Sequence, residues 1–432
     1  MPRRIIMIIL AGLITGILFF YSTPIESELA PDQLLTKENW TEMVGFKPDL
    51  ALGDFKSGDL IDKTNWEKVK DVVPETLLIL IKKYNMKLKI GDYKPVHPSK
   101  GYIDATNKYC RQVEIWDTKE EARKKGIKDY LPGLPFPNPQ NGLEIAWNYH
   151  FSYQADDADN RFGVYWISAK KGVERWEEWK WLYITRTINR TDIEPLPAIP
   201  EFAQKGIQYA SMTYALEPYD KKGLAALYNR FDEPRDQEGW LYIPTMRRVL
   251  RASFGTRGDS WNSTDLLYED VRGYMGYPEW MHWKLVGKRT VLAPMHAGIP
   301  ISKDALNKVY DFKNWPHWNP NMTWERRPVY VVEATPKFPD YPYSKMVLYY
   351  DAETFYITYK EAYDKKGELW KILINAFNES PEPDREPPSI GTCLVVDLQA
   401  EHATAFPWFD QVVNKNLDPS LFTITNLRKL GK

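Results

Sequence analysis

Apolar and polar side chains alternate with a period of two along much of the chain, between about residues 145 and 410. Alternation of this kind is typical of β-strands with at least one buried face. Segment 162–188 predicts a hairpin that turns at 170–172, and segment 225–253 predicts two strands around a polar loop. Further apolar runs between 326 and 406 predict a consecutive meander. We expect about 10–12 strands, and an antiparallel sheet of that size must curl, split or close.

One predicted hairpin strand is apolar on both of its faces. Trp179, Trp181 and Tyr183 alternate with Lys180, Leu182 and Ile184 in the segment WKWLYI and its surroundings. A sheet with one wet face would place polar residues on that side. We therefore expect a helix or a lid over one face, and a cavity or a core against the other.

The first part of the chain, residues 31–140, predicts a polar and helical extension. Apolar residues recur at helical spacing between Trp66 and Tyr84, with Pro74 either breaking this helix or starting a second one. The extension ends in LPGLPFPNPQNG (131–142), whose four prolines exclude a helix or a central strand. The next segment, 143–153, is interpreted as a strand. We expect the proline stretch to be an extended connector at a sheet edge, blocking stray strand pairing, with Phe136 inserted into apolar material.

Segment 255–325 is crowded with Trp, Tyr, Met and Pro residues. Apart from one short helix expected within 263–274, it shows no clean period. Irregular aromatic segments between strands usually cover something apolar, so we interpret the tract as an insert that forms a lid, chiefly over residues 274–324.

The N-terminus indicates export from the cytoplasm. Arg3 and Arg4 precede an uncharged, mostly apolar run that reaches Pro24, which predicts a signal peptide over residues 1–27 or, alternatively, a retained membrane anchor. Export would permit one disulfide between Cys110 and Cys393, but two unrelated buried thiols are the favoured interpretation.

Composition and motifs exclude several classes of function. The 432 residues carry a net charge of −1, which gives no electrostatic basis for nucleic-acid binding. No nucleophile elbow, zinc-protease helix, phosphate loop or dinucleotide fingerprint is present, and the six histidines lack ligand spacing. We therefore expect no catalytic residues, metal or cofactor. The acidic run 154–163 lacks the glycine and terminal glutamate of a calcium loop, and is interpreted as a solvated hairpin loop.

Several segments resemble a known family. GLPFPNPQNGLEIAWNY, GWLYIPTMRRVLRAS, WKLVGKR, YYDAETF and the terminal DPSLFTITNLRKLGK are similar to the bacterial domain of unknown function 1329, whose members are often labelled outer-membrane lipoprotein-sorting proteins. This family resembles the LolA/LolB superfamily of periplasmic lipoprotein carriers. The resemblance implies a mainly β fold with some α: a strongly curved antiparallel sheet that forms an incomplete barrel, with helices and an aromatic-rich lid on its concave side. It also implies an RND-type exporter and an outer-membrane protein as partners.

These observations together predict a periplasmic, non-enzymatic carrier or chaperone for a lipid or lipidated molecule. The expected organisation is a signal peptide or anchor (1–27), a helical extension with its connector (31–140), and a half-barrel (141–432) that contains the aromatic insert. The candidate pocket residues are aromatic: Trp147, Tyr165, Trp181, Tyr183, Tyr242, Trp280, Trp283, Tyr330 and Tyr350. Arg247, Arg248 and Arg251 are candidates for contact with an anionic headgroup or an acidic partner, the alternative being pairing with neighbouring carboxylates.

Two other classes of function stay open at this point. Tryptophan platforms and carboxylate pairs such as Glu177 and Glu178 are compatible with a glycan-binding protein or a carbohydrate-active enzyme, which would need two carboxylates across a cleft. A structural subunit of an envelope complex, with a filled concavity and no ligand, is the other alternative.

Overall fold

The computed structural model describes residues 33–116, 123–128, 130–253 and 258–430. The predicted signal segment 1–27 lies outside these residues. Within the described ranges, no helix has both the length and the apolar character needed to cross a membrane.

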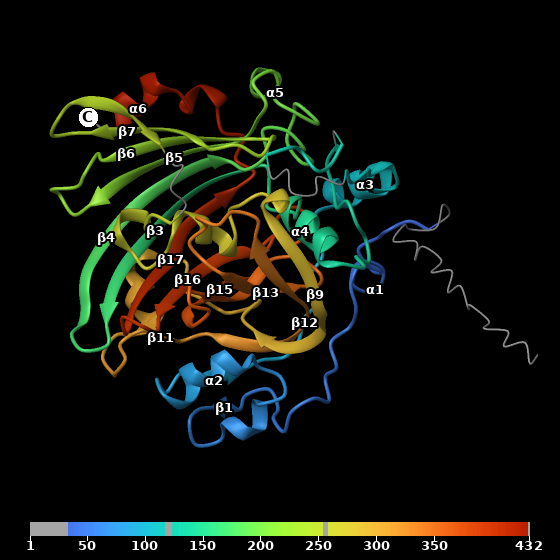
Figure 1. The fold of residues 1–432 in the computed structure, drawn as a ribbon, viewed down its shortest axis with the longest axis vertical. Coiled ribbons are helices and arrows are strands. Elements are labelled where there is room, and N and C mark those ends of the chain that lie inside the picture. Colours follow the sequence, from blue (N-terminus) through green and yellow to red (C-terminus); the bar gives the residue numbers. More distant parts are fainter. Residues whose placement is uncertain (1–32, 117–122, 129, 254–257, 431–432) are drawn as a thin grey trace, which may run out of the picture.

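The described residues are organised around one large, curved and unclosed sheet (Figure 1). Its hydrogen-bonded order is β1-β2-β12-β13-β14-β15-β16-β17-β3-β4-β5-β6-β7-β8, with β9 paired to β12 beside this path. The strands, together with the separate pair β10–β11, are β1 (Leu60–Ile61), β2 (Leu88–Ile90), β3 (Asp157–Ser168), β4 (Gly172–Ile184), β5 (Ile207–Glu217), β6 (Ala225–Phe231), β7 (Glu238–Ile243), β8 (Arg248–Ser253), β9 (Met281–Ala293), β10 (Tyr310–Asp311), β11 (Asn319–Pro320), β12 (Thr323–Pro336), β13 (Lys345–Asp351), β14 (Ile357–Tyr363), β15 (Leu369–Asn378), β16 (Ser389–Asp397) and β17 (His402–Val413). The expected curved antiparallel sheet is confirmed, and neighbours from β12 to β8 pair in antiparallel fashion.

Both faces of the sheet are covered, so alternate residues of one strand enter different cores. In β12, Tyr330 and Val332 belong to a core on the inner face, whereas Val329 and Val331 belong to a core on the outer face. The helices α1 (Trp40–Val44), α3 (Lys100–Tyr109) and α4 (Gly142–His150) supply the inner core. The helix α2 (Glu75–Lys82) supplies the outer core and lies outside the curve of the sheet in Figure 1.

The same two-sided burial holds in β4, as its sequence predicts. Trp179 packs in a core with the side chains of the inner face, while Leu182 and Ile184 pack in a separate outer core. That outer core is closed by α5 (Pro200–Ala203) and by the C-terminal α6 (Ile424–Leu430), which contributes Leu427. Apolar side chains on both faces therefore have separate cores to fill.

The interpretation of residues 143–153 as a strand is wrong, because Gly142–His150 form α4. Asn141 caps this helix by accepting the backbone N–H of Glu144, and the Glu144 carboxylate accepts in return from the Asn141 side chain and from the Gln140 backbone. Such a reciprocal cap satisfies backbone donors that the first turn would otherwise leave unpaired.

The proline stretch before α4 does not lie at a sheet edge. It packs between the helices instead: Leu134 N–H donates to the Thr106 hydroxyl of α3, and the amide of Asn148 in α4 bonds both the N–H and the carbonyl of Phe136. Burial of Phe136 among aromatic residues is confirmed, but the expected role of blocking stray strands is wrong.

The extension 33–140 contains strands as well as helices. A short 3₁₀ helix (Trp66–Val69) is followed by α2, which begins directly after Pro74, so the proline starts a second helix. Strand β2 pairs in parallel with the start of β12 and joins this segment to the large sheet.

The aromatic tract 255–325 is divided between the two faces and is more regular than expected. Residues 261–280 form three short 3₁₀ helices on the inner face: Trp261–Ser263, Tyr268–Gly273 and Pro278–Trp280. Met281–Ala293 form β9, a strand that the sequence interpretation missed. Residues between 297 and 322 then pack on the outer core, so the expected lid over 274–324 is wrong for everything after residue 280.

The acidic run 154–163 is not a solvated loop. Asp156 and Asp157 are almost fully buried, and Asp157 begins β3. The Asp156 carboxylate accepts backbone N–H groups of residues 191–193, and Asp157 accepts those of Lys415 and Leu417. These carboxylates hold two distant loops at the start of the strand.

The cysteines agree with two unrelated buried thiols. Cys110 belongs to the inner core with α3, Cys393 lies on β16 in another cluster, and no disulfide joins them.

Candidate functional site

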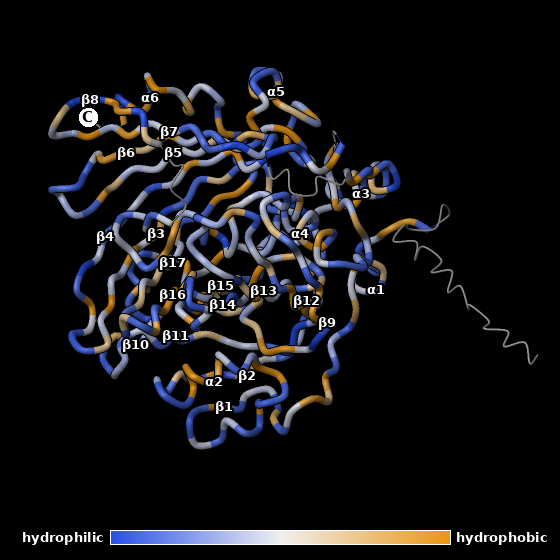
Figure 2. Tube along the Cα trace, in the orientation of Figure 1, coloured by the Kyte–Doolittle hydropathy of each residue, from blue (hydrophilic) through white to orange (hydrophobic). Residues whose placement is uncertain are grey.

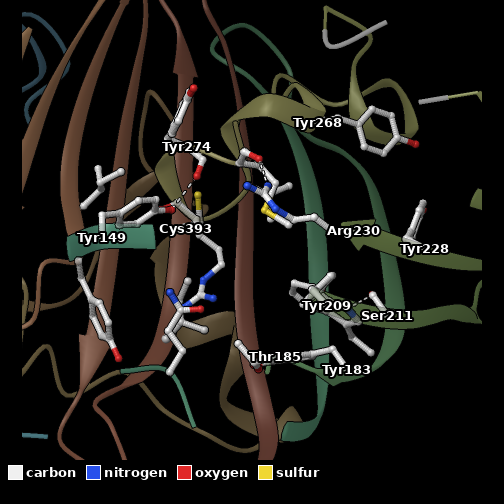
Figure 3. A pocket seen from close by; sticks show the side chains of 18 of the residues that line it. Tyr149, Tyr183, Thr185, Tyr209, Ser211, Tyr228, Arg230, Tyr268, Tyr274 and Cys393 are labelled. Atoms are coloured by element: carbon white, nitrogen blue, oxygen red, sulfur yellow. Dashed lines mark hydrogen bonds between the residues drawn. The ribbon is translucent and has the colours of Figure 1, made fainter. Parts of the chain in front are cut away.

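A cavity of about 230 Å³ lies between the inner face of the sheet and the segment 261–280. Strands β3–β6 and β14–β17, helix α4 and several connecting segments, among them 236–237 and 387–388, supply the rest of its lining. Figure 3 shows Tyr149 and Cys393 on one side of this space, with Arg230, Tyr209 and Thr185 across from them. An engineered apolar cavity of about 150 Å³ in another protein binds benzene. The cavity in this protein is larger, so it can hold part of an apolar molecule.

One part of the lining is aromatic and apolar. Phe162 of β3 is the centre of this wall, with ring centroids 5.7 Å from Trp408 and 5.8 Å from Trp261. Leu266, Val271, Ile390 and Phe406 complete it together with Trp181. Trp261 comes from the inserted segment and also contacts Trp179 and Phe406, so the insert is held against the strands by ring contacts.

The remaining lining is polar, and phenols are prominent in it. Burial raises the pKa of Tyr149, Tyr183, Tyr209 and Tyr356, which keeps these phenols neutral. Thr185, at the end of β4, has a hydroxyl that is buried and hydrogen-bonded to nothing among the described residues. The part of the cavity with these groups can donate and accept hydrogen bonds.

Arg186 of the lining is bound to the protein itself. Its guanidinium donates to the carbonyl oxygens of His150 and Ser152, at 2.9 and 3.0 Å, where α4 ends. A cation at a helix C-terminus satisfies carbonyls that have no partner within the helix. Burial lowers the pKa of Arg186 to about 10, so it stays charged at neutral pH.

Arg230 of β6 holds the inserted segment in place. It donates to the carbonyl oxygens of Met275 and Gly276 and stacks 4.0 Å from the Tyr277 ring. The guanidinium group of Arg230 therefore bonds the segment that covers the cavity.

Arg272 differs from these two arginines. Its carbonyl oxygen accepts from the Tyr149 hydroxyl at 3.1 Å, but its half-buried guanidinium forms no hydrogen bond or ion pair with any described residue. Two carboxylates, Asp236 and Glu269, also line the cavity, and neither pairs with Arg272.

His150 is a neutral group at this end of the cavity. Burial, followed by the charges of Arg230 and Arg186, holds its pKa well below the usual range. The Gln208 amide lies 2.7 Å from its Nε2, which a neutral imidazole can use as an acceptor. His150 therefore adds no charge to the site at neutral pH.

Three of the nine aromatic residues predicted from the sequence line the cavity: Trp181, Tyr183 and Trp280. The other six do not. Trp147 packs in a cluster with Phe136, Tyr165 faces the outer side against Phe312, and Tyr242 lies in the outer core near α6. Tyr330 and Tyr350 are fully buried in the inner core, and Trp283 packs on Tyr274 beside it.

Arg247, Arg248 and Arg251 also lie away from the cavity, at the exposed end strand of the sheet. Arg251 is 3.4 Å from Glu238 of the neighbouring β7, so the pairing alternative holds for this residue. Positive charges on a last strand discourage pairing with further strands.

The carboxylate pair Glu177 and Glu178 does not form a glycosidase site. The two side chains are consecutive on β4 and point to opposite faces: Glu177 is beside Arg175 and Lys221, and Glu178 is beside Arg161 and Lys303. Neither lines the cavity. No group of three or more potential metal ligands converges anywhere in the described part of the chain.

Sequence reasoning missed most of the lining residues. Tyr209, Ser211 and Thr213 alternate along β5, and this period-two pattern could have marked them as one face. Arg272 and its neighbours carry no such signal, because they lie in an irregular segment.

Comparison with known proteins gives the family. The model of the family described as protein of unknown function DUF1329 matches residues 60–428. The chain belongs to this family. The resemblance seen in the sequence is thereby confirmed.

The individual relatives of this DUF1329 chain share only a small part of its sequence. An uncharacterized protein of Pseudomonas aeruginosa is 26% identical over 324 residues, covering 72% of this chain and 67% of the relative. Among solved structures, an outer membrane lipoprotein-sorting protein domain from Vibrio parahaemolyticus has a TM-score of 0.47 at 17% identity, over 66% of this chain and 98% of that one. A DUF1329 family protein from Desulfovibrio piger has a TM-score of 0.46 at 16% identity, over 66% and 97% of the two chains.

Proposed function

We propose that this DUF1329 protein is a non-enzymatic carrier that binds a lipophilic molecule in the cavity beneath segment 261–280. The observation that carries the proposal is a hollow on the inner face which the protein's own side chains leave open, with an aromatic wall around Phe162 and Trp261. Each methylene transferred from water to such a wall contributes roughly 0.8 kcal/mol, so an alkyl chain supplies enough free energy for reversible binding.

Export is the second part of the proposal. The basic start and apolar run of residues 1–27 support a signal peptide or an anchor, and the protein would act in the periplasm. The exposed Arg247 and Arg248 form the surface that we propose for an acidic partner or headgroup, whereas Arg251 pairs with Glu238. The RND-type exporter and the outer-membrane protein implied by the family resemblance stay predictions. So do the boundaries of the extension and the half-barrel.

The test of the carrier proposal uses the uncharged dye N-phenyl-1-naphthylamine, which fluoresces in apolar surroundings. Ile390, half-buried in the cavity wall, is replaced by Trp to fill the space, and the exposed Val286 on β9 is replaced by Trp as the matched control. We expect saturable binding to the unchanged chain and to Val286→Trp, and at least tenfold weaker binding to Ile390→Trp. Equal dye binding by all three chains would contradict the proposal.

The alternatives give different results in the same experiments. A ligand-free structural subunit predicts no saturable dye binding and no change of Tm with any hydrophobic additive. A glycan-binding protein predicts that oligosaccharides raise the Tm while alkyl compounds do not.

A further inference from the structure

Arg272 is placed in the cavity lining by a backbone conformation that costs energy. Its φ is 62° and its ψ is 14°, in the left-handed region that non-glycine residues rarely adopt. Gly273 follows with a φ of 100°, and a Cβ there would come within 2.7 Å of the Ile357 side chain of β14. The chain thus reverses tightly against the sheet at this point. Unusual backbone conformations of this kind are concentrated at binding sites.

The surroundings of Arg272 provide a hydrogen-bond donor for its backbone carbonyl but no described counter-charge for its guanidinium group. The Tyr149 hydroxyl donates to both the Arg272 and the Tyr274 carbonyl oxygens, which fixes the turn. Arg186 and Arg230 direct their guanidinium groups at backbone carbonyls, whereas that of Arg272 has no partner among the described residues. A half-buried cation without a carboxylate is unfavourable unless a ligand provides the opposite charge.

Neutral hydrogen-bonding groups complete this part of the cavity. The charge of Arg272 opposes the effect of burial on the pKa of Tyr149, Tyr183, Tyr209 and Tyr356, so all four phenols feel it. The buried Thr185 hydroxyl, which has no partner in the described chain, lies in the same lining. The Tyr149 and Tyr356 hydroxyls already donate to backbone carbonyl oxygens, so the arrangement offers one planar cation and the hydroxyls of Tyr183, Tyr209 and Thr185 beside an aromatic wall.

We propose that the ligand is an amphiphile with an oxyanion head, a carboxylate or a phosphate, and that Arg272 binds this head while the wall around Phe162 holds the apolar part. The inference rests on the proposed function, because it assigns a ligand class to the same cavity. The guanidinium fork matches the two oxygens of a carboxylate or phosphate, which an alcohol or an ester does not offer.

The experiment compares decanoate, decyl phosphate and decanol as competitors of N-phenyl-1-naphthylamine. The chains are the unchanged protein, Arg272→Gln, Arg272→Lys and the control Arg247→Gln. Arg247 is a matched control because it too has a positive φ, of 51°, but is exposed away from the cavity. The comparison of decanoate with decanol on the unchanged protein needs no variant, so it holds even if a variant does not fold.

We expect the unchanged protein to bind decanoate or decyl phosphate about ten- to a hundredfold more tightly than decanol, the effect of one charge-assisted hydrogen-bonding group. Arg272→Gln should remove this preference, so that the affinities for decanol and the two anions come within about twofold of one another. Arg272→Lys should keep part of it, and Arg247→Gln all of it. Whichever of decanoate and decyl phosphate binds more tightly identifies the head group of the ligand as a carboxylate or a phosphate. Equal binding of decanol and both anions would overturn the inference while leaving the carrier proposal intact. Absence of dye binding would instead overturn the proposed function.

Discussion

The Lys360 ammonium of β14 lies 2.5 Å from the Asp270 carboxylate of the inserted segment, and both side chains are buried. Lys360 also donates to the Gly273 carbonyl, and the Tyr343 hydroxyl donates to the second Asp270 oxygen at 2.6 Å. This ion pair therefore fixes the segment that covers the cavity to the middle of the sheet, two residues from Arg272.

Replacing Lys360 by Met should lower the free energy of unfolding by about 3–5 kcal/mol, because the buried Asp270 charge loses its counter-charge. Chemical denaturation measures this loss. Lys345→Met is the control, since Lys345 is 3.6 Å from Glu333 in a partly exposed pair and should cost less than about 1 kcal/mol. The double change Lys360→Met with Asp270→Asn should recover part of the loss. A double variant less stable than Lys360→Met alone would contradict this explanation.

Gly273 should tolerate no side chain. Gly273→Ala adds a contact of 2.7 Å with Ile357 to the strain of a positive φ, so we expect a loss of about 2–4 kcal/mol. Gly206 has a φ of 63° and open space around it, so Gly206→Ala should cost only about 1 kcal/mol. The two Tm values, measured in one buffer, check the difference. Equal losses would show that the close approach to Ile357 is not important.

His402 predicts a dependence of stability on pH. Burial lowers the pKa of His402, but the hydrogen bond at 2.6 Å and the charge of Asp265 outweigh burial and raise it above the ordinary value. Because the pKa of His402 is higher in the folded state than in the unfolded state, protonation of His402 stabilises the folded protein. This stabilisation is complete at pH values below the unfolded-state pKa, near 6.5, and it is lost as the pH rises through the folded-state pKa. The Tm of the unchanged protein should exceed that of His402→Gln by most at pH 5–6, and the difference should shrink above pH 8. A difference that grows with pH would contradict the assignment.

The surface arginines should affect partners and not the cavity. Arg247→Gln combined with Arg248→Gln should leave dye binding within about twofold, because both side chains are exposed at the last strand of the sheet, away from the lining. The same double change should weaken adhesion to vesicles that contain an anionic lipid, if this edge is the contact surface. Unchanged adhesion would remove these residues from the proposal.

The strands of the meander were predictable because apolar and polar residues alternate along them with a period of two. Trp181 and Tyr183 were among the candidate pocket residues and lie in the cavity lining, but alternation alone did not show which face of the strand would be the inner one. In α4 the burial of Ile145, Ala146 and Trp147 in succession gave an apolar run that fits either a strand or a buried helix. The pair Asn141 and Glu144, three residues apart, was the cap signal that could have decided it.

The site was less predictable than the fold, because its residues depend on which face each strand presents and on an irregular segment. Tyr165 and Trp166 are adjacent on β3 and pack in cores on opposite faces of the sheet. A shift of the strand by one residue would exchange their faces, and the sequence alone does not fix that register. Arg272 reaches the cavity through a left-handed turn whose position follows from contacts with Tyr149 and Ile357, which are distant in the sequence.

The most direct test of the central claim is native mass spectrometry of the protein purified from the periplasm of cells that express the whole chain, followed by solvent extraction. We predict one amphiphile of lipid size for each chain, released by the solvent and absent from Ile390→Trp. The mass of the bare chain in every preparation, with no extractable lipid, would contradict the carrier account.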